Sequence, residues 1–217
     1  MVNDGLLRVT SFVVVIVAFQ VAVARFSLEQ EAKRRWQHAI TGHALVQISY
    51  LLPIHLSIAA LVAGAAGIAY MRHFKSELYL KAFGPLLRPD ELEDGRLPGA
   101  YYFLVGTALA ATLFPINTAR YAVECLAFAD PIAAWAGQSI PSPKLHKSAS
   151  LAGCLACFAT AWIIGWIMIR EDVDTSADIF RITLGAFACC VAEAFTFGND
   201  NLLIPLITAA AVHQADY

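Results

Sequence analysis

The stretch Ala127-Phe-Ala-Asp130-Pro131-Ile-Ala-Ala-Trp-Ala-Gly137 places one carboxylate among small and apolar residues. A charged side chain that faces lipid costs about 3 kcal/mol or more, so Asp130 is expected to face the protein interior or a water-filled cavity. On helical spacing, Ala127, Ala133, Ala134 and Gly137 lie near the Asp130 face, which lets a neighbouring backbone approach closely. Two interpretations follow: a polar site at the end of a membrane helix, or a buried structural acid that is hydrogen-bonded to a neighbour.

The composition around this stretch indicates a membrane protein. Of the 217 residues, 59% are hydrophobic and only 15% are charged, whereas charged residues make up about 25% of a soluble domain. Because the apolar residues also occur in long runs, we expect an all-α fold, a polytopic integral membrane bundle of about seven to eight transmembrane helices. The net charge of -2 argues against nucleic acid as a partner.

The apolar runs predict where the chain crosses the bilayer. The expected spans are residues 6–24, 39–52, 53–71, 99–114, 118–137, 150–169, 177–195 and 202–212, with a break at Pro53 and a hydrophilic loop over residues 72–98. We expect a single membrane domain of residues 1–217, in which the first span is an additional N-terminal helix.

The basic residues predict the orientation. When the loops alternate between the two sides, one side holds only Arg8, Arg120 and Arg170, and the other side holds the remaining lysines and arginines except Arg181, which lies inside an expected span. The basic side corresponds to the cytosolic or equivalent side. It also holds the polar motifs described below, so we expect one catalytic or binding site at the cytosolic membrane surface.

A basic motif, Arg34-Arg35-Trp-Gln-His38, begins the second span. Arg34 and His38 are four residues apart and share a helix face. Arginine has a planar fork of donors that suits phosphate, and histidine can act as a general base or bind phosphate. The alternative interpretation is a basic anchor beside lipid headgroups.

Two lysines, Lys144 and Lys147, lie in a proline-containing loop before a helix that is expected to start near Ser150. A helix N-terminus together with a lysine can bind phosphate oxygens. The alternative is that these lysines only follow the charge bias of cytosolic loops.

A third polar motif, Asn199-Asp200-Asn201, separates two apolar helices, and Glu193 lies about two turns before it. These side chains can ligate a hard cation or hydrogen-bond a base, whereas an ordinary helix cap needs only one of them.

The chain also has five cysteines, all in apolar segments, which we interpret as small buried helix residues rather than as a metal or redox site: Cys125, Cys154, Cys157, Cys189 and Cys190.

Taken in order, five motifs resemble a known family. They are Arg34–Gly42, Arg96–Gly106, Asp130–Gly137, Ser150–Gly153, and Glu193 followed by Asn199–Leu206. Over about residues 30–212 the chain is similar to the CTP-dependent polyprenol and diacylglycerol kinases, which include dolichol kinase, phytol kinase and the yeast-type diacylglycerol kinase. This family is distantly related to phosphatidate cytidylyltransferase.

The resemblance implies transfer of the γ-phosphate of CTP to a membrane lipid alcohol (a polyprenol, phytol or diacylglycerol) with Mg2+ as the metal. It implies that Asp130 and Asp200 hold the metal or orient the alcohol, with His38 as a further catalytic candidate. The residues expected to bind the nucleotide and its phosphates are Arg34, Arg35, Lys144, Lys147, Ser150, Asn199 and Asn201.

One departure from the family supports a second hypothesis. The family loop reads Lys-Ser-x-x-Gly, but Ala149 stands at the lysine position here and Lys147 comes two residues early. The chain is therefore either an active kinase or a degenerate, inactive kinase-like fold that serves as an accessory structural subunit of a larger organellar membrane complex. Its expected partners are membrane lipids, the lipid alcohol and, in the second case, other subunits. The expected location is the endoplasmic reticulum or a plastid or mitochondrial membrane.

Overall fold

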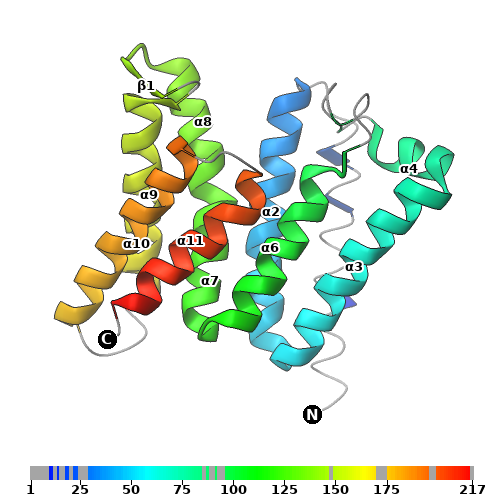
Figure 1. Ribbon diagram of the computed structural model, residues 1–217, viewed down its shortest axis with the longest axis horizontal. Helices are drawn as coiled ribbons and strands as arrows, with labels where there is room; N and C mark the ends of the chain where they lie inside the picture. Colours follow the sequence, from blue (N-terminus) through cyan, green and yellow to red (C-terminus); the bar gives the residue numbers. More distant parts are fainter. Residues whose placement is uncertain are drawn as a thin grey trace. The chain divides into compact units, whose positions relative to one another are not determined.

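The computed structural model is mostly helical, which confirms the predicted all-α class. It describes residues 10, 11, 14, 18, 19, 22, 23, 29–84, 87, 91, 96–146, 149–169, 175–195 and 199–215. Most of the expected first span, 6–24, lies outside these residues. The chain divides into two compact units, Met1–Ala108 and Leu109–Tyr217, and each is described by itself (Figure 1). The expectation of a single membrane domain stays a prediction.

The first unit contains α2 (Gln30–Leu51), α3 (Ile54–Phe74), α4 (Ser76–Phe83) and the beginning of α6 (Gly99–Leu113). The predicted break at Pro53 is confirmed, because α2 ends at Leu51 and α3 begins at Ile54. Proline has no N–H to donate and its ring fixes φ, so it is tolerated at the start of a helix and not in its interior.

The short helix α4 was not predicted and lies within the expected loop 72–98. Its Tyr79 is fully buried and packs with Ile68 of α3 and with Leu87. The guanidinium of Arg72 lies 5.0 Å from the centre of the Tyr79 ring, a distance at which a cation is attracted to an aromatic face. Tertiary packing around this tyrosine therefore holds α4 against the end of α3.

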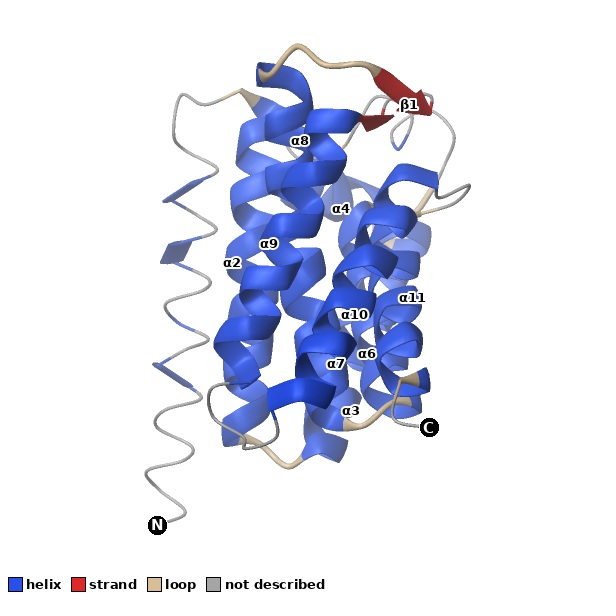
Figure 2. Ribbon diagram, turned by 90° about the vertical axis from the view of Figure 1, so that its left-hand side faces the viewer, coloured by secondary structure: helices blue, strands red, loops and turns tan. Residues whose placement is uncertain are grey.

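The second unit continues with α7 (Ile116–Glu124), the π-helical turn η2 (Cys125–Ala129) and α8 (Asp130–Ser139), which form one uninterrupted helical run. The strands β1 (Lys144–His146) and β2 (Ala149–Ser150) form a small antiparallel hairpin, with Lys144 opposite Ser150. Three helices follow: α9 (Leu151–Ile169), α10 (Thr175–Phe195) and α11 (Asp200–Gln214). Helix α9 packs against α8 and α10, α10 packs against α11, and α11 packs against α7. Figure 2 shows the hairpin at the end of α8 and α9.

Small residues fill the interior of this second unit, and large apolar residues face outward. The buried positions include Ala119, Ala122, Ala161, Ala186 and Cys189. The exposed positions include Leu155, Ile163 and Ile167 on α9, and Phe180 and Phe187 on α10. This distribution is typical of helices that pack closely inside a membrane, where the outer surface is in contact with lipid.

Among the described residues, two helices are long and apolar enough to cross a membrane, Ile54–Phe74 and Leu151–Met168, and Gly99–Leu113 is a shorter apolar helix. Seven to eight spans therefore remain a prediction. Four of the five cysteines are buried, as predicted, and Cys190 is half-buried. The Sγ atoms of Cys157 and Cys189 lie 3.7 Å apart, and both cysteines are free thiols.

Candidate functional site

Asp130 is the first residue of α8 and follows directly on the π turn. Within a continuous helix, Pro131 cannot donate a hydrogen bond to the carbonyl four residues earlier, and its ring would collide with that carbonyl. A widened turn relieves this conflict, and such turns are frequent at functional sites. The local sequence therefore places a half-buried carboxylate at an irregular point of the helix.

Asp200 is the exposed first residue of α11, where the positive end of the helix dipole stabilises a carboxylate. Asn199 is the N-cap residue, and its carbonyl oxygen accepts hydrogen bonds from the N–H groups of Leu202 and Leu203 at 3.0 and 3.1 Å. The Asn199 side chain makes no capping hydrogen bond, although asparagine usually does so in this position. Asn199 and Asn201, both half-buried, thus flank Asp200 with two carboxamide groups.

Glu193 of α10 connects these two acids. Its carboxyl group interacts electrostatically with both Asp130 and Asp200, and its buried Oε2 atom has no hydrogen-bond partner within the described part of the chain. Three helices of the second unit therefore bring three acidic side chains near one another, including the two residues predicted to hold the metal. Carboxyl groups that interact in this way can be neutralised by a bound cation or by a proton.

The described residues contain no group of three or more His, Cys, Asp or Glu side chains arranged to hold a metal ion. The acidic cluster is therefore not a metal cage made of protein alone. It still fits Mg2+, because this ion is usually bound by one or two carboxylates together with substrate phosphates and water. Carboxylate and carboxamide oxygens are also the hard donors that Mg2+ prefers.

The hairpin before α9 contains the predicted phosphate loop. Lys144 is exposed on β1, and Lys147 lies outside the described residues. Ser150 is buried, and its Oγ accepts a hydrogen bond from the Gly153 N–H at 3.2 Å. The Leu151 N–H donates to the Pro143 carbonyl at 2.9 Å, and the Ala152 N–H donates to Ser142 Oγ at 3.0 Å. The first turn of α9, which was expected to bind phosphate, thus uses three of its N–H groups within the chain.

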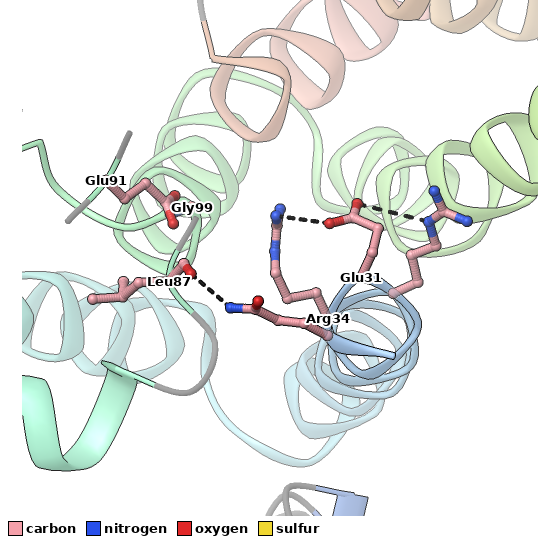
Figure 3. Close-up of polar contacts among 7 residues, drawn as sticks. Glu31, Arg34, Leu87, Glu91 and Gly99 are labelled. Atoms are coloured by element: carbon pink, nitrogen blue, oxygen red, sulfur yellow. Dashed lines mark hydrogen bonds and ion pairs between the residues drawn. The ribbon is translucent and has the colours of Figure 1, made fainter. Parts of the chain in front are cut away.

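In the first unit, α2 carries the predicted Arg34, Arg35 and His38. Figure 3 shows Arg34 beside Glu31. Both arginines form ion pairs with Glu31, a residue that was not predicted as part of the site. His38 is half-buried, and its ring lies nearly perpendicular to that of Phe103, with the ring centres 4.7 Å apart. The position of Glu31, three and four residues before the two arginines, was the sequence signal that could have identified it.

One side chain at this end of α2 is hydrogen-bonded to the chain that follows α4. Gln30 donates from Nε2 to the carbonyl of Leu87 at 2.7 Å. The nearby Glu91 is buried, and its Oε1 accepts a hydrogen bond from the N–H of Gly99, the first residue of α6, at 2.9 Å. The arginines and His38 belong to the first unit and the acidic cluster to the second, so their convergence on one site stays a prediction.

His146 was part of the basic loop in the sequence but was not among the predicted site residues. It is half-buried, and the centre of its ring lies 5.3 Å from the centre of the Phe195 ring. This contact holds the hairpin against the C-terminal end of α10. Glu193 lies in the last turn of the same helix. Spacing in the sequence could not show that β1 folds back onto α10.

Comparisons with known proteins identify two relatives. The chain is 30% identical over 151 residues to the CTP-dependent diacylglycerol kinase 1 of Schizosaccharomyces pombe, a match that covers 64% of this chain and 68% of the relative. It is 22% identical over 158 residues to the CTP-dependent diacylglycerol kinase 1 of Saccharomyces cerevisiae, covering 63% of this chain and 54% of that relative. No family model and no solved structure matches the chain.

Proposed function

This chain belongs to the CTP-dependent lipid kinase family represented by these two diacylglycerol kinases, and we propose that it phosphorylates diacylglycerol in the membrane. In this reaction the lipid hydroxyl oxygen attacks the γ-phosphorus of CTP and forms the new O–P bond. The bond from that phosphorus to the oxygen bridging to the β-phosphate breaks, CDP leaves, and the hydroxyl proton passes to a base. Diacylglycerol is preferred over a polyprenol or phytol because both relatives are named for it.

The observation that carries the proposal, beyond the family, is the cluster formed by Asp130, Glu193 and Asp200. Bound Mg2+ would supply neutralisation of the triphosphate charge. Asp130 and Asp200 are the residues proposed to hold it, with the Asn199 and Asn201 carboxamides as neutral oxygen donors. Because Asp130 is half-buried at the start of α8, it is also the residue proposed to orient the lipid hydroxyl group.

The proposed contacts to CTP come from basic and hydroxyl side chains. Guanidinium groups bind phosphate oxygens through paired N–H donors, and lysine contributes a point charge. The residues proposed for this role are Arg34, Arg35, Lys144, Lys147 and Ser150, with His38 as the candidate base. For Ser150 this role requires a rearrangement, since its buried hydroxyl accepts the Gly153 N–H.

We also propose that the chain spans the membrane about seven to eight times and that the site opens on its cytosolic side. The bias of lysine and arginine toward one set of loops supports this orientation. The outward-facing leucine, isoleucine and phenylalanine side chains of α9 and α10 support contact with lipid. The proposed compartment is the endoplasmic reticulum or an organellar membrane.

A second candidate function, an inactive accessory subunit of a larger membrane complex, is favoured by the loop before α9. Ala149 stands where the family has lysine, and the first N–H groups of α9 are already hydrogen-bonded within the chain. A phosphate loop with these properties has fewer groups for a triphosphate than an active kinase would have.

The deciding experiment uses the purified full chain in lipid vesicles with Mg2+ and CTP labelled at the γ-phosphate. Diacylglycerol, a polyprenol and phytol are offered in parallel. We expect labelled phosphatidate, and we expect Asp130→Asn and Asp200→Asn to reduce the rate about 100-fold or more, because both carboxylates act on the charge of the transferred phosphate. Asp178→Asn is the matched control, because Asp178 pairs with Arg181 within α10 at 3.6 Å. A chain that neither binds CTP nor labels any lipid, and that co-purifies with other subunits, would support the second candidate.

A further inference from the structure

One carboxylate links the two arginines of α2. Glu31 Oε2 lies 3.1 Å from Arg34 Nη1, and Glu31 Oε1 lies 3.8 Å from Arg35 Nε. The two arginine side chains are 22% and 19% exposed, and that of Glu31 is 44% exposed. The Glu31 side chain is thus the most exposed of the three, and Figure 3 shows its carboxylate facing Arg34.

Helix geometry alone would separate the two arginines. Neighbouring residues of an α-helix leave the axis about 100° apart, so Arg34 and Arg35 start in different directions. Glu31 lies three residues before one and four residues before the other, and these are the two spacings at which helical side chains meet. Because each oxygen of Glu31 engages a different arginine, the carboxylate draws the two guanidinium groups toward a common point.

The position of the pair near the start of the helix favours such a partner. All three residues lie in the first turns of α2, where the helix dipole is positive and disfavours cations. The acid of the first turn offsets both the dipole and the mutual repulsion of the arginines. Exposed ion pairs of this spacing are weak, so a triphosphate with several negative charges can bind the arginines without a large opposing energy.

From this geometry we infer that Glu31 is a positioning residue, which holds Arg34 and Arg35 together so that both can bind the phosphates of one CTP molecule. The inference rests on the proposed function, because it assumes that these arginines bind phosphate. It predicts a change in CTP affinity opposite to the change that simple electrostatics predicts for the loss of this charge. Removing a negative charge near a bound anion should strengthen binding, whereas removing a positioning group should weaken it.

The matched pair of variants is Glu31→Gln and Glu29→Gln. Glu29 is the exposed N-cap residue of the same helix, and its side chain makes no capping hydrogen bond, so its variant removes the same charge without removing the bridge. The affinities of the full chain in detergent for Mg2+-bound CTP and for inorganic triphosphate are measured by calorimetry. KM and kcat are measured in vesicles, and the melting temperature is measured without nucleotide.

We expect Glu31→Gln to raise the CTP dissociation constant and KM about three- to fivefold, with kcat changed less than twofold. Glu29→Gln should leave the affinity unchanged or slightly increased. In a background with Arg34→Gln and Arg35→Gln, the addition of Glu31→Gln should have no further effect on the affinity.

Unchanged or tighter CTP binding by Glu31→Gln would overturn the positioning role, even where the wild-type chain phosphorylates diacylglycerol. An equal loss of affinity in the arginine-free background would also overturn it. Weaker binding that only accompanies a lower melting temperature, and that Glu29→Gln reproduces, would assign Glu31 a purely structural role. A wild-type chain that binds neither CTP nor triphosphate would overturn both this inference and the proposed function.

Discussion

Tyr121 of α7 occupies the space that Gly185 leaves open on α10: a Cβ atom at position 185 would lie 2.8 Å from Cε1 of the tyrosine ring. On the other side of the ring, a Cβ at Gly165 of α9 would lie 3.1 Å from Cε2. The buried Tyr121 hydroxyl donates to the Ala161 carbonyl at 3.2 Å. One aromatic side chain is thus enclosed by two helices that can approach it because each has a glycine at the contact.

The first prediction tests this contact with Gly185→Ala. The added methyl group would also meet Val212 Cγ2 at 2.6 Å, so the helices must separate, and overpacking of this kind costs about 1–3 kcal/mol. We expect a lower melting temperature in detergent. Gly67→Ala on α3 is the control, because a Cβ there meets no atom within 4 Å. It should leave the melting temperature unchanged or raise it, since alanine is the better helix former. Equal effects of the two variants would contradict the packing described for Tyr121.

The second prediction concerns the N-terminal cap of α9. Ser150→Ala removes the acceptor of the Gly153 N–H, and the loss of a serine cap costs about 1 kcal/mol. We expect Ser150→Ala to lower the melting temperature without nucleotide. The control is Ser139→Ala at the exposed end of α8, which should have little effect. If Ser150→Ala and Ser139→Ala melt alike, the cap contributes nothing to stability.

The third prediction concerns the Tyr79 hydroxyl, which is buried and has no hydrogen-bond partner among the residues that the structure describes. Because a buried unpaired polar group is unfavourable, Tyr79→Phe should be neutral or stabilising, and the Arg72 contact with the ring is retained. Tyr79→Ala should destabilise by about 3–5 kcal/mol, because it leaves a cavity. Unfolding by denaturant at pH 8 measures both, and a strongly destabilised Tyr79→Phe would indicate a partner for the hydroxyl.

The fourth prediction is the pH dependence that Tyr79 causes. Burial raises the pKa of Tyr79 above its ordinary value of 10.0, and the Arg72 guanidinium only partly opposes the rise. Above pH 10 the unfolded chain therefore loses the phenol proton while the folded chain keeps it, and stability falls as pH increases. Tyr79→Phe should show a smaller loss of stability between pH 9 and pH 11 than the wild type. Identical pH profiles would show that Tyr79 does not contribute.

The fifth prediction uses cysteine reactivity. Cys190 is half-buried, whereas Cys125, Cys154, Cys157 and Cys189 are buried, so a maleimide should label Cys190 first under native conditions. Peptide mapping by mass spectrometry identifies the labelled residue, and Cys190→Ala should abolish the fast phase. Early labelling of Cys157 or Cys189 would contradict the packing of α9 against α10.

Much of the helical framework could be predicted from the sequence, because apolar runs and prolines directly limit the length of each helix. The break at Pro53 and the helix that begins at Gly99 were both predicted. Helix α4 was missed, since its fully buried side chain, Tyr79, is covered by residues distant in sequence. The π turn before Asp130 was missed, because Pro131 was interpreted as following the acid in a regular helix and not as a reason for the preceding turn to widen.

The candidate site was predictable as residue types and not as contacts. The polar motifs at Asp130 and Asp200 stand out in apolar surroundings, but only helix packing brings both near Glu193. The capping role of Ser150 was also hidden, because its hydroxyl serves the backbone of its own helix. Glu31 was overlooked as an ordinary acid of a first turn, although its spacing to the arginines was visible.

The π turn at Cys125–Ala129 has a consequence for how the carboxylate at residue 130 is aimed. A wide turn contains one residue more than a regular turn, and one residue corresponds to about 100° of rotation around the axis. Deleting a single residue from this turn would leave the sequence of α8 unchanged, but it would turn Asp130 toward a different neighbour. The direction of the Asp130 side chain therefore depends on the number of residues in the turn before it, as well as on the groups that surround it.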